Sequence, residues 1–216
     1  MPPSPALLYS FRRCPYAMRA RMALILCKKS VAVQEISLKA KPAGLLAANP
    51  KGTVPVLIKP NGEVLCESLD IMLMAIAESQ DQDMKNQLNH RMEAALELIH
   101  QHDTGFKPWL DKYKYFDRHP EHPQHFYRQH YCQFLNRLEQ QLGHRNWLLG
   151  DKPSLADIAL FPFVRQFAAV DSHWFENAPL PELKRWLGCW LRHPAFTACM
   201  HKYPEGGEPQ LLRQIG

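Results

Sequence analysis

The sequence predicts an α/β domain over residues 1–80, followed by an all-helical domain over residues 84–216. In the first part, short apolar runs typical of strands alternate with segments of helical periodicity, in the order β-α-β, connector, β-β-α. Beyond the polar segment ESQDQDMKNQ (78–87), apolar residues recur only at helical spacing, and no convincing strand is found. The chain has 216 residues, 46% of them hydrophobic, which is enough for two domains with their own cores.

Each expected element of the first domain has a local signal. Strands are expected at short apolar or alternating runs, at residues 6–11, 31–36, 54–58 and 63–67. The last two strands are joined by Asn61-Gly62, a strong hairpin signal. A helix is expected over 15–28, because its apolar residues share one face and Pro15 suits a first helical position. A short helix or loop is expected over 41–52, and Ser68 can cap a further helix.

In the second domain the helical signals come from spacing and caps. Apolar residues recur at helical intervals in two segments, 92–99 and 134–142. Ser154 followed three residues later by Asp157 resembles a capping box, which predicts a helix start there. A last helix is expected within the segment PELKRWLGCWLRHPAF (181–196), ended by the His193-Pro194 pair.

Composition disfavours several classes of protein. No apolar stretch approaches about 18 residues, and MPPSPALLYS lacks the features of a secretory signal, so a soluble, cytoplasmic protein without membrane contact is expected. The net charge of +5 is spread along the chain, which disfavours nucleic-acid binding. The six cysteines are scattered without a CxxC pair, so neither a disulfide framework nor a zinc site is expected. Histidines gather in DRHPEHPQHFYRQH, but its prolines break any regular face and no metal site is predicted.

Cys14 is the candidate nucleophile. It directly precedes Pro15 at the start of the first expected helix, with four arginines within seven residues. Unpaired N–H groups at a helix N-terminus, helped by nearby positive charge, stabilise a thiolate. The alternative is an inert core cysteine, which is the expected state of Cys27 on the apolar face of the same helix.

Three further features would suit a ligand that carries a thiol, a peptide bond and free amino and carboxylate groups. If the Val54-Pro55 bond is cis, the backbone polar groups of Val54 turn outward to pair with a peptide. Ser68 and the adjacent N–H groups could bind a carboxylate, while Glu67 could pair with an ammonium group. Lys39 and Lys41 follow the second strand. Each feature also has an ordinary structural explanation, as a loop end, a helix cap or solvated lysines.

These segments carry a family resemblance that spans essentially the whole chain. The first 80 residues resemble the thioredoxin-like domain of cytosolic glutathione transferases, and RCPYA (13–17) is most similar to the omega-type, cysteine-containing members. NPKGTVPVL and ESLDI resemble the glutathione-site segments of that family, and SLADIALFP resembles a helix start of its second domain.

The resemblance implies a residue-level site. Cys14 would form a mixed disulfide with glutathione, the cosubstrate, and no metal is implied. The residues that would contact glutathione are Lys41, Val54, Pro55, Glu67 and Ser68. Aromatic residues of the second domain, either a second-substrate pocket or core, are Phe106, Trp109 and Tyr113. A homodimer is also implied.

The expected activity is glutathione-dependent thiol transfer or reduction acting on a disulfide or small electrophile. Ala17 stands where a second cysteine would resolve the mixed disulfide internally, so a second glutathione must discharge it. One alternative is conjugation, in which a hydroxyl such as that of Tyr9 or Ser10 would assist the glutathione thiolate. The other is a non-catalytic binding or regulatory protein of the same fold.

Overall fold

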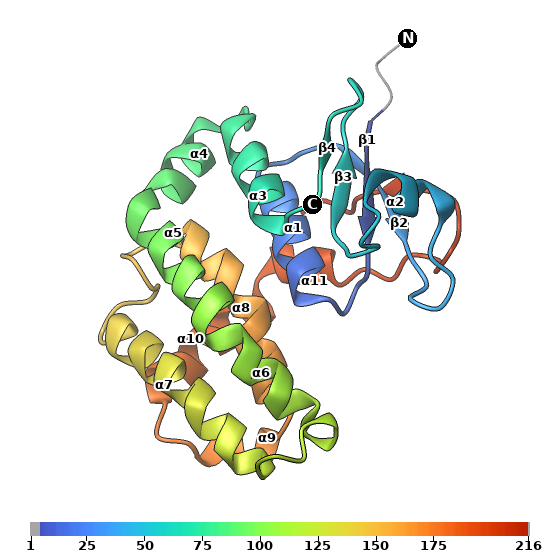
Figure 1. The fold of residues 1–216 in the computed structure, drawn as a ribbon. Helices are drawn as coiled ribbons and strands as arrows, with labels where there is room; N and C mark the ends of the chain where they lie inside the picture. The colour runs from blue at the N-terminus through green and yellow to red at the C-terminus, as the bar shows by residue number, and fades with distance from the viewer. Residues whose placement is uncertain (1–4, 216) are drawn as a thin grey trace. The chain divides into compact units, whose positions relative to one another are not determined.

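The computed structural model describes residues 5–215 and divides into two compact units (Figure 1). The first unit contains the chain up to Asn86 together with the chain from Arg192 onward, and the second is Gln87–Leu191. The expected boundary near residues 80–84 therefore lies close to the one observed. The C-terminal segment, however, belongs to the first unit, and the expected all-helical domain over 84–216 needs correction there.

A five-stranded mixed sheet in the order β4-β3-β1-β2-β5 is the centre of the first unit. Its strands are β1 (Ala6–Ser10), β2 (Val31–Glu35), β3 (Val56–Ile58), β4 (Val64–Leu65) and β5 (Gln210–Leu211). β1 and β2 run parallel, with Leu8 opposite Val33, whereas β3 is antiparallel to β1. A parallel pair needs a crossover connection, and the helix between β1 and β2 supplies it. The β-α-β and β-β-α order predicted from the sequence is confirmed.

Helices pack against this sheet. The helices that lie wholly in the first unit are α1 (Pro15–Leu26), α2 (Ala43–Ala48), α3 (Ser68–Ala77) and α11 (Pro194–Cys199). Every residue of α1 except Tyr16 is buried, and α1 packs against both α3 and α11. Leu45 of α2 forms a separate apolar cluster with Tyr9, Ile36 and Val56. Since side chains alternate along a strand, Tyr9 faces this cluster while Leu8 faces the other side of the sheet.

The strand β5 is the main feature that the sequence does not predict. It pairs antiparallel with the edge strand β2, with Leu211 opposite Ala32. Two backbone bonds extend the pairing, from the Leu212 N–H to the Val31 carbonyl and from the Gly206 N–H to the Glu35 carbonyl, both 2.8 Å. A two-residue strand has too short a pattern to detect, and its partner lies at the other end of the chain.

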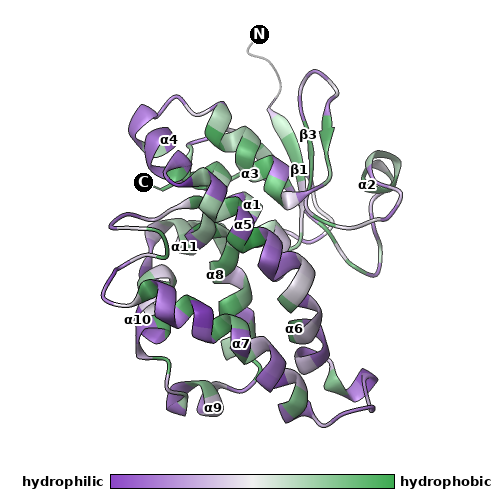
Figure 2. Ribbon diagram, turned by 60° about the vertical axis from the view of Figure 1, so that its left-hand side comes forward, coloured by the Kyte–Doolittle hydropathy of each residue, from purple (hydrophilic) through white to green (hydrophobic). Residues whose placement is uncertain are grey.

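The polar segment 78–87, expected to be the boundary between the two domains, contains most of α4 (Gln82–Asn89), a helix that the sequence analysis did not identify. Asp81 accepts a hydrogen bond from the Met84 N–H at 3.0 Å, and Leu88 is buried. A side-chain cap and one buried apolar residue suffice for this short helix. Figure 2 shows the contrast between the hydrophilic α4 and the largely hydrophobic α8.

The second unit is helical within its described residues. Its helices are α5 (Met92–Gln101), α6 (Lys107–Lys114), α7 (Gln124–Leu142), α8 (Leu155–Ala168), α9 (Ser172–Asn177) and α10 (Pro181–Arg192), the last of which ends at the first residue of the other unit. A π-helical turn, His102–Phe106, connects α5 and α6, and a 3₁₀ turn at Phe116–Arg118 follows α6. No helix within residues 5–215 is long and apolar enough to cross a bilayer.

The predicted capping box at the start of α8 is present. Ser154 is the N-cap, and the buried Asp157 carboxylate accepts hydrogen bonds from the Ser154 N–H at 2.8 Å and hydroxyl at 2.6 Å. The same carboxylate accepts from the Leu148 N–H at 2.9 Å and from the Trp186 indole at 2.8 Å. Burial raises the pKa of Asp157 despite these four donors, which lower it. The carboxylate thus joins α8, α10 and the segment before α8.

Candidate active site

Cys14 lies at the junction between β1 and α1. Its N–H donates to the Phe11 carbonyl at 3.0 Å, which closes a tight turn, and its carbonyl accepts from the Met18 N–H at 2.9 Å as the first bond of α1. Cys14 is the N-cap residue and Pro15 occupies the first helical position. The side chain is half-buried and free, so the sulfur is neither sealed in the core nor joined to another cysteine.

The sulfur of Cys14 lies beside the loop before β3. Its thiol is 3.7 Å from the Val54 carbonyl oxygen, which it contacts as a donor. The Val54-Pro55 bond is cis. Within residues 5–215 no hydrogen-bond partner is found for the Val54 N–H. A ligand held with its thiol at Cys14 would therefore have the unpaired Val54 N–H within reach as a hydrogen-bond donor.

Lys41 lies against the same loop. A Cβ placed on Gly52 would be 3.0 Å from the Lys41 ammonium nitrogen, so the lysine side chain covers this glycine, whose φ is +62°. Lys39 is exposed. The structure thus brings Lys41 close to the loop that carries Val54.

Asn49 organises this loop and was not predicted as a site residue. Its side-chain amide donates to the Thr53 carbonyl at 3.2 Å and to the Thr53 hydroxyl at 2.8 Å. Its own carbonyl accepts the Gly52 N–H at 2.8 Å. The available signal was the Asn-Pro-Lys-Gly sequence, a turn pattern in which asparagine bonds to nearby backbone.

Glu67 and Ser68 lie at the start of α3, but Ser68 is not the helix cap that the sequence predicts. Glu67, which is exposed, occupies the N-cap position without a side-chain cap bond, and Ser68 is the first helical residue. The buried Ser68 hydroxyl instead accepts a hydrogen bond from Nε of Arg19 at 2.8 Å. Because it accepts this bond, the hydroxyl keeps its own proton for donation to a ligand.

Arg19 is therefore a candidate site residue that the sequence did not single out. It lies on α1, five residues after Cys14, and is only 3% exposed. Its guanidinium also lies 4.9 Å from the centroid of the Tyr16 ring. The sequence treated Arg19 only as one of four neighbouring positive charges, because contact with Ser68 depends on how α1 and α3 pack.

The four arginines near Cys14 have different environments. Arg13 is exposed and lies over the Phe11 ring at 5.6 Å, and Arg12 is half-buried. Arg21 is fully buried and faces the Glu35 carboxylate at 3.5 Å. Since this carboxylate offsets the charge of Arg21, the simple expectation that all four arginines favour a thiolate needs correction.

The hydroxyls of Tyr9 and Ser10, the alternative candidates for assisting the glutathione thiolate, do not lie at the position of Cys14. Tyr9 is 5% exposed, packs in the cluster with Leu45, and its hydroxyl approaches Gly44. Ser10 is fully buried and accepts a hydrogen bond from Arg21 at 2.9 Å. Both hydroxyls are committed to packing within the first unit.

Three of the other cysteines, Cys27, Cys132 and Cys199, have surroundings unlike those of Cys14. Burial raises the pKa of Cys27 to about 11, against the hydrogen bond to Ser79, and burial also raises the pKa of Cys132 to about 11. Cys199 is buried, and its thiol contacts the Met18 carbonyl at 3.6 Å. A thiol with a raised pKa stays protonated at neutral pH and reacts slowly.

The three aromatic candidates of the second unit contact neighbouring helices. Tyr113 is 1% exposed and its ring lies 5.0 Å from that of Phe167, so it belongs to the core of this unit. Phe106 lies 5.0 Å from the Phe134 ring, and Trp109 stacks on His130 at 4.2 Å. Phe106 and Trp109 keep partial exposure and remain candidates for ligand contact.

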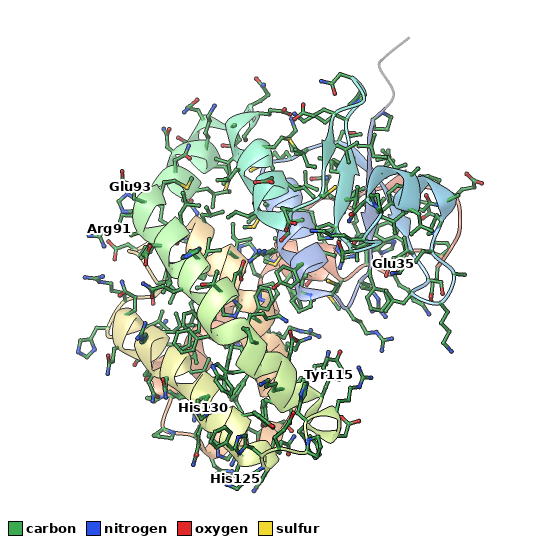
Figure 3. All side chains as sticks on the ribbon, viewed as in Figure 1. Glu35, Arg91, Glu93, Tyr115, His125 and His130 are labelled. Atoms are coloured by element: carbon green, nitrogen blue, oxygen red, sulfur yellow. The ribbon has the colours of Figure 1, made fainter. Side chains whose placement is uncertain are left out.

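No group of three or more metal-ligating side chains within residues 5–215 is arranged to hold a metal ion. Several histidines of the clustered segment make ring contacts instead. His122 stacks on Phe126 at 4.0 Å, and His130 on Trp109. Figure 3 labels His125 and His130, which both belong to α7.

Comparison with known proteins gives two family matches in chain order. Residues 8–82 match the family model described as the N-terminal domain of glutathione S-transferase, and residues 107–189 match its C-terminal domain.

Curated relatives agree with these matches at low identity. One is glutathione S-transferase omega-1 of Mus musculus, 26% identical over 196 residues, which are 90% of this chain and 79% of the relative. Another is maleylacetoacetate isomerase of Pseudomonas aeruginosa, 27% identical over 202 residues, 88% and 92% of the two chains.

Solved structures share the fold. A glutathione transferase family member from Pseudomonas fluorescens, crystallised with two glutathione molecules, has a TM-score of 0.76 at 21% identity over 93% of this chain and 94% of its own. A glutathione transferase from Pseudomonas putida with bound glutathione disulfide has a TM-score of 0.74 at 22% identity, covering 92% of each chain. Because both domains of the family are matched in chain order, over residues 8–82 and 107–189, the chain belongs to the glutathione S-transferase family.

Proposed function

We propose that this protein is an omega-like, glutathione-dependent thiol transferase in which Cys14 is the nucleophile. One observation carries the proposal. The Cys14 sulfur lies 3.7 Å from the Val54 carbonyl, and the N–H of the same Val54 has no hydrogen-bond partner within residues 5–215. A cysteinyl residue of glutathione paired with Val54 would hold its sulfur against that of Cys14.

The rest of the site suits the two ends of glutathione. Ser68, supported by the buried Arg19, would donate its hydroxyl proton to the γ-glutamyl carboxylate, and the N–H groups at the start of α3 favour the same anion. Exposed Glu67 would pair with the ammonium group. Lys41 and cis-Pro55 shape the loop on which the peptide portion rests.

Two exchange steps complete the reaction. The Cys14 thiolate attacks the glutathione sulfur of a mixed disulfide, forms the Cys14–glutathione disulfide and releases the substrate thiolate, which takes up a proton. A second glutathione, as thiolate, then attacks the glutathione sulfur of that disulfide and regenerates the Cys14 thiolate with release of oxidised glutathione. The net reaction converts one mixed disulfide and one glutathione into a thiol and glutathione disulfide.

Ala17 supports this scheme over a dithiol mechanism. It stands on α1, one turn after Cys14, where a resolving cysteine would otherwise be in reach. The thiols of Cys66 and Cys199 contact the carbonyls of Ala48 and Met18, and both cysteines are free, so neither forms a disulfide with Cys14.

An activity comparison tests the proposal against conjugation. We expect wild type to reduce a small glutathione mixed disulfide with free glutathione, and Cys14→Ala to lose at least 99% of that activity. Conjugation of glutathione to an aryl halide should be weak in the wild type. If Cys14→Ala retains disulfide reduction, or if conjugation dominates and survives the substitution, the proposal is wrong.

Binding to immobilised glutathione separates the remaining alternative. A non-catalytic relative with a degraded site would flow through, whereas this protein should be retained and eluted by free glutathione. The proposal includes a cytoplasmic homodimer, as the family resemblance implies. Light scattering after gel filtration tests the dimer, and a mass corresponding to one chain of 25.0 kDa would contradict it.

A further inference from the structure

A buried charge pair lies beneath the loop that precedes Cys14. Arg21 of α1 is 0% exposed, and Glu35 at the end of β2 is 6% exposed. Their closest charged atoms, Nη1 of the arginine and Oε2 of the carboxylate, are 3.5 Å apart. Burying two charges is costly unless they meet further partners, so the remaining contacts of the pair indicate what it does.

Those further contacts are made with the loop. Nη2 of Arg21 donates to the Arg12 carbonyl at 2.7 Å, and Nη1 donates to the Ser10 hydroxyl at 2.9 Å. The Arg12 N–H donates to Oε1 of Glu35. Both peptide groups of Arg12 are thus held by the charge pair, two residues before Cys14.

The pair also connects this loop to the helix that Cys14 caps. Arg21 follows Cys14 by seven residues, which is two turns of helix, so both project from about the same face of α1. Glu35 is fixed in turn, because its carbonyl accepts the Gly206 N–H of the C-terminal segment at 2.8 Å. Glu35 is labelled in Figure 3. Helix α1, strand β2 and the C-terminal segment together determine where the loop can lie.

We propose that Arg21 and Glu35 are positioning residues for Cys14, holding the Arg12 peptide so that the sulfur stays at the N-terminus of α1 beside Val54. The proposal rests on Cys14 being the nucleophile. Without the pair the loop can shift, the sulfur moves out of its contact with the Val54 carbonyl, and exchange with glutathione slows. A displacement of about 1 Å at a reacting atom can cost as much as about a hundredfold in rate.

A double variant separates positioning from a merely structural role. A single substitution leaves one buried charge alone and is destabilising, whereas replacing both partners with apolar residues is often tolerated. Arg21→Met with Glu35→Leu removes one positive and one negative charge, so the net charge near Cys14 is unchanged. The contacts that are lost are the ion pair itself and its hydrogen bonds to Ser10 and Arg12.

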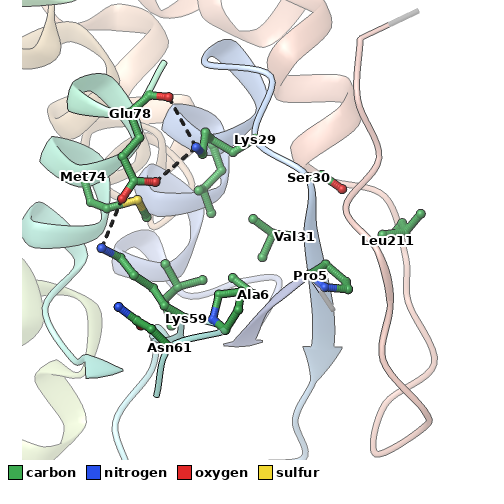
Figure 4. Close-up of a pocket in the computed structure, with 13 residues that line it drawn as sticks. Pro5, Ala6, Lys29, Ser30, Val31, Lys59, Asn61, Met74, Glu78 and Leu211 are labelled. Atoms are coloured by element: carbon green, nitrogen blue, oxygen red, sulfur yellow. Dashed lines mark hydrogen bonds and ion pairs between the residues drawn. The ribbon is translucent and has the colours of Figure 1, made fainter. Parts of the chain in front are cut away.

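The matched control removes a charge pair at the other end of the same unit. Glu78 bridges Lys59 and Lys29 at 3.1 Å each, beside a cavity of about 600 Å³ that lies at the Ala6 end of β1, away from Cys14 (Figure 4). Lys59→Met with Glu78→Leu also leaves the net charge unchanged. This control should leave the reactivity of Cys14 within twofold of wild type.

The measurement is the rate at which Cys14 reacts with glutathione disulfide and with iodoacetamide, followed site by site by mass spectrometry. Cys27, a buried thiol of the same unit whose pKa is raised by burial to about 11, is the internal reference. In the Arg21→Met, Glu35→Leu protein we expect both Cys14 rates to fall about tenfold and the Cys27 rate to stay unchanged. A general loosening of this unit would instead accelerate the reaction of Cys27.

A fall of less than threefold at Cys14, or a fall matched by the control variant, overturns the proposal. If the double variant does not fold, Arg21→Lys tests the proposal instead. A lysine keeps the positive charge but cannot bond to both the Ser10 hydroxyl and the Arg12 carbonyl as the two guanidinium nitrogens do. The rates at which Cys14 reacts should then fall at least threefold. Should wild type form no adduct with glutathione disulfide, the proposed function fails, while the iodoacetamide rates still decide the positioning role.

Discussion

The C-terminal strand offers a sharp test, because two adjacent leucines differ in burial. Leu212 is 4% exposed and donates its N–H to Val31 of β2, whereas Leu211 is 65% exposed. If residues 203–214 are an integral part of the first unit, Leu212→Ala should destabilise the protein and Leu211→Ala should not. The two substitutions remove the same atoms from neighbouring positions.

The expected magnitude follows from burial. Replacing a buried leucine by alanine costs about 2–5 kcal/mol, and the value falls toward the lower end where the surroundings can relax, as near a chain end. We therefore expect a loss of about 2–3 kcal/mol for Leu212→Ala. The loss for Leu211→Ala should be within about 0.5 kcal/mol of zero. For a chain of this size, the first loss corresponds to a fall in Tm of about 4–12 °C.

The assay combines urea unfolding with native-state hydrogen exchange. Exchange of the Leu212 N–H and of amides in β2 reports local undocking of the strand, which a global unfolding curve alone would miss. In Leu212→Ala these amides should lose protection, while those of the second unit keep theirs. Equal stability of the two variants, or a wild-type Leu212 N–H that exchanges as fast as an unstructured amide, would refute the reasoning.

Three further predictions concern the site and the helical unit. Ser68→Ala and Arg19→Met should each raise the KM for glutathione about tenfold or more in steady-state assays, because a hydrogen bond to a charged group contributes about 1.5–3 kcal/mol; an unchanged KM would remove Ser68 from the site. Cys27 and Cys132, with pKa values of about 11, should resist alkylation at pH 7.5 and react about tenfold faster per pH unit up to that value; rapid labelling at neutral pH would contradict their burial. Asp157→Ala should yield little folded protein by circular dichroism, since four buried donors each lose an acceptor worth about 1–3 kcal/mol against a total of about 5–15 kcal/mol; a variant with wild-type Tm would show that the donors find other partners.

The linkage between thiol titration and stability has a definite sign. The pKa of Cys27 rises from 9.0 to about 11 on folding because burial disfavours the thiolate. Between these values the unfolded chain has released the proton and the folded chain has not. Stability therefore declines as pH rises from about 9 to 11, and this part of the decline should vanish in Cys27→Ala.

The sequence was sufficient for features that depend on local pattern. The strands at β1 and β2, the helix after Cys14 and the Ser154–Asp157 capping box were all predictable, because periodicity and capping act over a few residues. The cis Val54-Pro55 bond could be raised as a possibility from the X-Pro signal alone.

The features that were missed depend on residues far apart in the chain. Arg19 meets Ser68 only because α1 packs on α3, and Arg21 meets Glu35 only because β2 lies beside β1. The strand β5 has no pattern of its own and forms because an unpaired sheet edge is available. Local sequence analysis therefore located the candidate nucleophile but could not identify the charges that surround it.

The most direct measurement of the central claim is the intact mass after incubation with glutathione disulfide. We predict a single glutathione adduct on wild type, assigned to Cys14 by peptide mapping, absent from Cys14→Ala and retained in the matched control Cys132→Ala. Free glutathione should remove it. The account is contradicted if Cys14→Ala forms the same adducts as wild type, or if the folded wild-type protein forms no adduct.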